Sequence, residues 1–434
     1  MSITLSSPAR IAALTAFLLC GGISTLSAPV QAQQAPPPPP PPPPEANPPT
    51  APTTPVPPST PGTPTPPEEA SPGTPPAPPE ASGGSAPTPS SGGRTLLLPD
   101  ISLNGILLGH LSTDKRDQTR DKLRLQEAEL AIQGFVYPDI RLDTFTVFSS
   151  EGANVEEAYL TVQNVPYVHL PLSAVLGRRK VPIGRVNQLH PHSWLYAVQP
   201  YVLTNLVSNE SLTGDGAYVS YLLPTGKLFA QLDAGFWSQS EVAESLTPAN
   251  DPTVGIVTSP GAGFADKFTT LRLQTATSAM GGDIEASGSL VLGRGLSYTT
   301  ANSVSVRPQT MLSGLSLTYR RAGRGASHLL LRSEYYEHSQ KDGSFRNSTD
   351  GYYFFANQQL DDFTSLGLRY DRSGFPFAPG LHEDGISLIG TRSLTEATYL
   401  RGQINQGNRP GKRNFTEVFL QIVFGVGPHT HNLE

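Results

Sequence analysis

Apolar and polar residues alternate with a period of two in short segments from about residue 96 to the end of the chain. One segment places Leu228, Ala230, Leu232, Ala234 and Phe236 on one face and Gln231, Asp233 and Gly235 on the other. Segments 284–292 and 417–424 show the same alternation. This pattern predicts β-strands with one apolar and one polar environment. We find no stretch with the pattern of a long amphipathic helix.

The alternation defines sixteen candidate strands, the first near 100–111 and the last near 415–425. Their connections alternate between short turns and longer segments. The expected long connections are 112–121, 179–213, 240–264, 294–310, 339–350, 372–384 and 406–414. A soluble β-sandwich or solenoid has no reason to gather its long loops at one end. An even number of strands with short and long connections in alternation therefore predicts an all-β fold, a transmembrane antiparallel β-barrel of the outer-membrane type.

Charged residues occupy the polar face of many candidate strands. They are Glu127, Glu129, Glu157, Asp233, Arg272, Glu285, Arg332, Glu334, Arg369 and Arg401. A barrel of sixteen strands encloses a lumen that is wide enough for water. We therefore expect these side chains to point inward and to stay hydrated. Pro171 lies inside the candidate strand 168–178, which predicts that this strand starts later or contains a bulge.

The connection at 179–213 is the longest between two clear strands, and we expect it to fold into the lumen. Otherwise Trp194, Leu195 and Leu203 would be exposed to water. The connection begins with four cations, which are Arg178, Arg179, Lys180 and Arg185. They are our candidates for an anion-binding pore constriction. Alternatively, they lie at the outer rim and bind lipopolysaccharide phosphates.

The first 95 residues have a different composition. Residues 1–32 carry one cation (Arg10), an apolar run and a small-residue cleavage site at 30–32, as in a secretory signal peptide. Residues 33–95 form a Pro-rich segment, and 26 of the chain's 44 prolines lie at 33–93. It has too few apolar side chains to fold, so we expect a disordered periplasmic linker. The barrel then covers 96–434.

The chemistry-bearing residues exclude several function classes. The single cysteine, Cys20, lies in the predicted signal peptide, so the mature chain would have no thiolate nucleophile or disulfide. No motif for an enzyme, a cofactor or a nucleic acid is present. Two pairs of histidines, His190 with His192 and His429 with His431, have the spacing that points both imidazoles the same way on an extended chain. They are candidate metal ligands, or alternatively polar side chains of a loop and of a terminus with no ligand role.

Three segments carry a resemblance to a known family. They are LRLQEAELAIQG at 123–134, VEEAYLT at 155–161 and GRRKVPIG at 177–184. Together they resemble the start of the phosphate-selective porins (O/P type) of Gram-negative outer membranes, whose Gly-x-x-Lys-x-Pro element maps to Gly177, Lys180 and Pro182. The resemblance implies a sixteen-stranded pore, often a homotrimer, in which cationic residues guide anions through the constriction.

These observations predict a porin-like channel in the cell outer membrane, for passive diffusion of small hydrophilic solutes and with a preference for anions. Its expected partners are outer-membrane lipid and lipopolysaccharide. Removing the 1 cation and 4 anions of residues 1–93 from the chain's 30 and 36 leaves 29 and 32, so any selectivity depends on local placement of charge. The alternative is a receptor or structural tether whose barrel is closed by its loops and whose Pro-rich tail contacts peptidoglycan.

Overall fold

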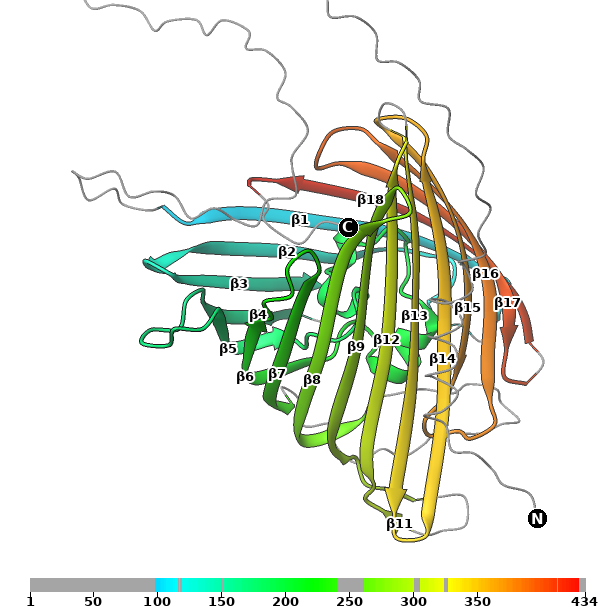
Figure 1. Cartoon of the computed structure of the whole chain (residues 1–434). Helices are drawn as coiled ribbons and strands as arrows, with labels where there is room; N and C mark the ends of the chain where they lie inside the picture. The colour runs from blue at the N-terminus through cyan, green and yellow to red at the C-terminus, as the bar shows by residue number, and fades with distance from the viewer. Residues whose placement is uncertain are drawn as a thin grey trace, which may run out of the picture. The chain divides into compact units, whose positions relative to one another are not determined.

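A computed structural model describes residues 98–428 apart from 116, 118, 150–151, 240–260, 300–304, 324–326 and 412. The predicted signal peptide and Pro-rich linker, and the histidines at 429 and 431, lie outside the described residues. Sixteen of the strands form one closed antiparallel barrel, in which β1 pairs with β18 from Leu103–Val426 to Ser112–Glu417 (Figure 1). The predicted all-β, sixteen-stranded barrel is confirmed.

The barrel strands follow each other around the wall in chain order. They are β1 (Asp100–Ser112), β2 (Lys122–Tyr137), β3 (Ile140–Ser149), β4 (Gly152–Val162), β5 (Leu172–Lys180), β6 (Thr213–Leu222), β7 (Phe229–Gln239), β8 (Phe264–Ala279), β9 (Gly282–Gly295), β12 (Gln309–Ala322), β13 (His328–Asp342), β14 (Phe345–Gln359), β15 (Thr364–Gly374), β16 (His382–Ser393), β17 (Tyr399–Arg409) and β18 (Arg413–Val426). Two short strands, β10 (Tyr298–Thr299) and β11 (Ser305–Val306), pair with each other in a connecting loop. Within the described residues, no helix is long and apolar enough to cross a membrane.

The period-two pattern is explained by the two sides of the wall. Large apolar side chains on the strands are exposed outward, including those of Leu103, Leu160, Leu176, Phe236, Leu271, Leu331, Phe354, Leu388 and Leu420. Their neighbours along each strand face the lumen. Antiparallel pairing around the whole wall satisfies the backbone groups of the strands, which is the condition for crossing lipid with strands. The architecture is that of an outer-membrane barrel.

Two of the expected long connections are wrong. At 339–350 and 406–414 the strands continue, so that β13 and β14 pair up to Asp342–Phe345 and β17 and β18 up to Arg409–Arg413. Gly343 turns the first hairpin with a φ of 54°. Apart from Phe345 and the glycines and proline of these segments, the side chains here are polar on both faces, so the hydrophobic alternation ends although the backbone pairing does not. The expectation for Pro171 is confirmed, because β5 begins at Leu172.

Candidate functional site in the barrel lumen

The connection between β5 and β6 lies inside the barrel. We call residues 181–212 the lumen loop; it contains the short helical turns η1 (Val186–Gln188), η2 (Pro191–Ser193) and η3 (Leu203–Val207) (Figure 1). The side chains of Trp194 and Leu203 are 3% and 0% exposed and belong to one apolar cluster with inward-facing wall residues such as Phe355. Leu195 packs against this cluster. The entry of this loop was predicted from its length and its apolar side chains.

Wall arginines and a wall glutamine bind the backbone of the lumen loop. Nη1 of Arg369 donates a 2.7 Å hydrogen bond to the carbonyl oxygen of Val198, and Nη1 of Arg401 donates one of 3.1 Å to that of Tyr196. Oε1 of Gln403 accepts a 2.7 Å bond from the amide of Ala197. Backbone groups that leave water need such partners, and the wall supplies them from strands β15 and β17.

A wall carboxylate binds the start of the loop. Oε1 of Glu334 accepts hydrogen bonds from the amides of Arg185 (3.1 Å) and Val186 (2.9 Å). Oε2 of the same carboxylate accepts a 2.7 Å bond from the hydroxyl of Tyr336. Glu334 and Arg369 are both fully buried. We expected such charges to face inward and stay hydrated; the first expectation is confirmed and the second is wrong, because the lumen loop displaces water and pairs with them.

The densest group of charges joins the loop to strands β2, β4 and β5. We call Glu129, Glu156, Glu157, Lys180 and His190 the His190 cluster. Nδ1 of His190 lies 2.6 Å from Oε2 of Glu129 and 3.0 Å from Oε2 of Glu156, while Nε2 lies 2.8 Å from Oε2 of Glu157. Nζ of Lys180 lies 2.8 Å from Oε1 of Glu156. Four groups of the cluster are at most 5% exposed, and the side chain of Glu156 is 13% exposed.

A β-bulge places two consecutive glutamates on the same side of the wall. The pairing of β3 with β4 shifts by one residue between Phe145–Glu157 and Thr146–Val155, which leaves Glu156 as the extra residue. Regular alternation would point Glu156 toward lipid. The bulge turns its carboxylate inward instead, so that both glutamates reach the imidazole of His190.

The two histidines of the lumen loop have opposite pKa shifts. Burial and the ammonium of Lys180 both lower the pKa of His190, but the carboxylates of Glu129 and Glu156 outweigh them and raise it well above its usual value. Burial dominates for His192 and lowers its pKa to about 4. The imidazole rings stack with centroids 5.7 Å apart. The structure therefore brings this pair of predicted metal ligands together with carboxylates, while the second pair lies beyond the described residues.

The four predicted pore cations do not lie together. Arg178 follows the outward parity of Leu176 and forms a bidentate pair with Asp215, with distances of 2.8 and 3.2 Å. Lys180 is paired within the His190 cluster. Arg185 is half-buried at the start of the lumen loop. Arg179 and Lys180 both line an open space, and the guanidinium of Arg179 lies 4.5 Å from the ring centroid of Tyr159.

This space is a cavity of about 250 Å³ between the lumen loop and strands β2 to β6. Its lining residues are Gln133, Arg141, Asp143, Phe145, Glu157, Tyr159, Thr161, Gln163, Arg179, Lys180, Gln188, Leu189 and His190. Several of them adjoin the connections at 138–139 and 163–171, so the cavity lies toward the end of the barrel that carries these two connections. Within the described part of the chain, no carboxylate forms an ion pair with Arg179. The guanidinium also donates to the hydroxyl of Tyr218, which orients its charge, and the carboxylates of Asp143 and Glu157 lie on the same cavity lining.

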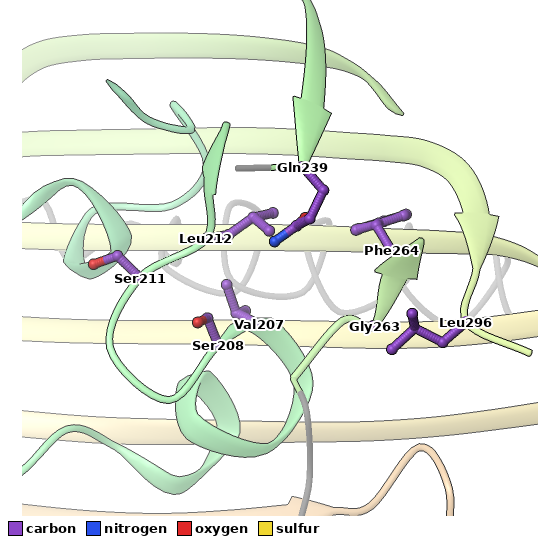
Figure 2. Close-up of a pocket in the computed structure, with 8 residues that line it drawn as sticks. All are labelled: Val207, Ser208, Ser211, Leu212, Gln239, Gly263, Phe264 and Leu296. Carbon is purple, nitrogen blue, oxygen red and sulfur yellow. The ribbon is translucent and has the colours of Figure 1, made fainter. Parts of the chain in front are cut away.

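A smaller cavity of about 60 Å³ lies beside the C-terminal part of the lumen loop (Figure 2). Val207, Ser208, Ser211 and Leu212 from the loop face Gln239, Gly263, Phe264 and Leu296. The volume of this cavity is about a quarter of that of the larger cavity. We therefore place the candidate solute site at the larger cavity.

The comparisons with known proteins support the fold. No protein-family model matches the chain. Over 128 residues it is 29% identical to an uncharacterised protein of Aquifex aeolicus, a match that covers 29% of this chain and 26% of that protein. The solved structure of OprB from Pseudomonas putida superposes with a TM-score of 0.50 at 11% identity, covering 76% of this chain and 94% of that chain. At this identity the likeness shows a shared fold alone.

Two other solved structures have similar scores. An anion-selective porin from Comamonas acidovorans and the outer membrane channel DcaP of Acinetobacter baumannii each give a TM-score of 0.49 at 12% identity. Both matches cover 76% of this chain, with 100% and 98% of the respective neighbours. The class of the molecule is a closed sixteen-stranded antiparallel β-barrel with a loop folded into its lumen, a fold that it shares with OprB.

Proposed function

We propose that this chain is an outer-membrane channel for passive diffusion of small hydrophilic solutes, and that the lumen loop forms its constriction. The observation that carries the proposal is the position of residues 181–212, which are held inside a closed barrel by wall side chains. The cavity beside the loop would be one part of the solute path. The proposal assigns no catalytic activity to the chain.

We further propose a preference for anions, supported by the placement of Arg179. Its cation faces the cavity between two tyrosines, and Arg141 lies on the same lining. A cation meeting a solvated anion at about 4 Å contributes about 1 kcal/mol at the dielectric constant of water, and more where water is scarce. Arg141 is partly neutralised by Asp143, because Nε lies 2.9 Å from Oδ1. Arg179 is therefore the main determinant in this proposal.

A second candidate is a loop-closed barrel that acts as a receptor or tether. The full burial of Leu203, Tyr196 and Val186 in the lumen loop favours it, because these side chains fill space that a wide pore would leave to water. In that case the Pro-rich segment would contact the cell wall. Assembly as a homotrimer, which the family resemblance implies, stays a prediction. The alternative that the four cations bind lipopolysaccharide phosphates at the outer rim is kept for Arg178, which lies on the outer face.

Reconstitution into planar bilayers separates the two functions. We expect the purified full chain to give discrete single-channel steps in potassium chloride, because a path beside the loop admits hydrated ions. As a control, protein that has been unfolded by heating, as shown by its changed mobility on gels, should give no conductance steps. A folded barrel that inserts without any steps would support the closed tether and contradict the channel.

A further inference from the structure

We propose that the lumen loop is fastened to the barrel wall by a divalent transition-metal ion, held between His190, Glu129 and Glu156. Their three candidate ligand atoms all lie within 4.8 Å of one another. The three residues come from different parts of the chain: His190 directly precedes η2 in the lumen loop, Glu129 lies on β2 and Glu156 lies on β4. An ion at this point would therefore join the loop to the wall.

The separations of these atoms fit a common cation. Nδ1 of His190 lies 2.6 and 3.0 Å from the nearest oxygens of Glu129 and Glu156. Neighbouring ligands around a cation with bonds of about 2.1 Å are about 3 Å apart. Small movements of the three side chains would accommodate the ion without rearrangement of the strands.

The other ring nitrogen of His190 has the partner that metal-binding imidazoles usually have. Nε2 lies 2.8 Å from Oε2 of Glu157. A carboxylate on one nitrogen fixes the proton there and directs the lone pair of the opposite nitrogen toward the metal. Glu157 in turn accepts a 2.8 Å hydrogen bond from the backbone amide of Lys180, which holds its position.

The surrounding charges favour a cation. Glu127 is also buried near the site, and its Oε1 lies 3.5 Å from Nδ1 of His192. Among the described residues this oxygen makes no hydrogen bond. Four carboxylates then surround two cations, the ammonium of Lys180 and the imidazolium of His190, and buried carboxylates are costly without positive partners. A divalent ion that replaces the proton on Nδ1 of His190 adds one further positive charge, and His192 and Glu127 are placed to complete its ligands.

Mixed imidazole and carboxylate donors select the class of ion. Carboxylates alone suit calcium and magnesium, whereas an imidazole among them suits zinc and neighbouring first-row metals. A second candidate group is His110, Asp117 and Glu417, where Nη2 of Arg409 lies 2.9 Å from Oε1 of Glu417, the same oxygen that faces His110. At the His190 site Lys180 pairs with Oε1 of Glu156, while Oε2 faces the imidazole. We therefore assign the ion to the His190 site alone.

The test measures zinc bound to the refolded full chain, so it does not depend on conductance. The chain carries His429→Ala and His431→Ala, which remove the terminal histidine pair. After treatment with chelator and dialysis against buffered micromolar zinc, we expect one zinc per chain by elemental mass spectrometry. His190→Ala and Glu156→Gln should each lower the affinity at least tenfold, while His382→Ala, an exposed histidine on β16, should not.

Absence of stoichiometric zinc in the parent chain would overturn the site, as would equal affinity in folded His190→Ala. If a variant does not fold, as judged by the loss of the heat-modifiable gel mobility of a folded barrel, a second measurement on the parent chain tests the site instead. Cobalt added to that chain should then give visible d–d absorption bands that zinc abolishes. A spectrum no different from that of cobalt in buffer would show that the cluster is an ion network without a metal.

Discussion

Oε1 of Glu334 accepts a 2.9 Å hydrogen bond from the backbone amide of Val186, which joins the middle of β13 to the first helical turn of the lumen loop. The carboxylate is fully buried and also accepts from the amide of Arg185. Two amides of the loop therefore depend on one wall side chain. This relationship shows how the wall holds the loop in the lumen.

Replacing this carboxylate should loosen the loop. In Glu334→Ala the two amides lose their acceptor, and an unsatisfied buried donor costs about 1–3 kcal/mol. Since about 1.4 kcal/mol changes an equilibrium tenfold, the displaced form of the loop should gain about tenfold or more in population. We expect larger and noisier single-channel conductance. Glu337→Ala, three residues further along β13 and on its outer side, is the matched control and should conduct as the parent chain does.

Gly184 should tolerate no side chain because the loop approaches the wall closely there. Its φ is 52°, and a Cβ would lie 2.0 Å from the hydroxyl oxygen of Tyr336 and 2.3 Å from Oε2 of Glu334. Gly226 also has positive φ, at 73°, but a Cβ there would meet nothing within 4 Å. Strain in the backbone is thus similar at both positions, and only Gly184 adds a steric clash.

We therefore expect Gly184→Ala to increase proteolysis within residues 181–212 by an externally added protease, and Gly226→Ala to leave it unchanged. The fragments can be identified by mass spectrometry of the folded protein. Equal cleavage of the two variants would mean that the approach of the loop to Glu334 does not hold it in place.

Charge reversal on adjacent residues tests the anion preference. Arg179→Glu replaces the cation that faces the cavity, so the reversal potential in a potassium chloride gradient should move toward cation selectivity. Arg178→Glu changes the same charge on the outer face, where it opposes Asp215, and should leave the reversal potential unchanged. If both variants shift the potential equally, the placement of the two arginines does not determine selectivity.

The sequence predicts the wall better than the contents of the lumen. Alternation at segments such as 228–236 reports which side chains face lipid, and this local signal gives the strand number and the inward side of Glu334 and Arg369. Whether an inward charge is hydrated or paired depends on a distant segment, and the pairing of Glu334 with Val186 has no local signal. The hairpin at Gly343 was missed because hydrophobic alternation stops at the membrane boundary, whereas strand pairing continues beyond it.

The site shows the same division. The pattern His190-x-His192 made this pair candidate metal ligands, and the expectation that Glu129 and Glu157 lie on the inner face is confirmed. Glu156 should have pointed outward by alternation, and only the bulge in β4 brings it to the imidazole. Arg178 and Arg179 were grouped as pore cations because they are adjacent in the sequence. On a strand, however, adjacent side chains point to opposite faces.

The most direct test of the central claim, that solutes pass beside the lumen loop, uses chemical modification of Gln188. This residue belongs to η1 and lines the larger cavity. Cys20, the single cysteine of the chain, is first replaced by Ser, and Gln188→Cys is compared with Leu176→Cys on the outer face. A charged thiol reagent should reduce the current through the Gln188→Cys channel by at least half and leave the Leu176→Cys channel unchanged. Complete modification of Cys at 188, verified by mass spectrometry, with no change in current would contradict the claim.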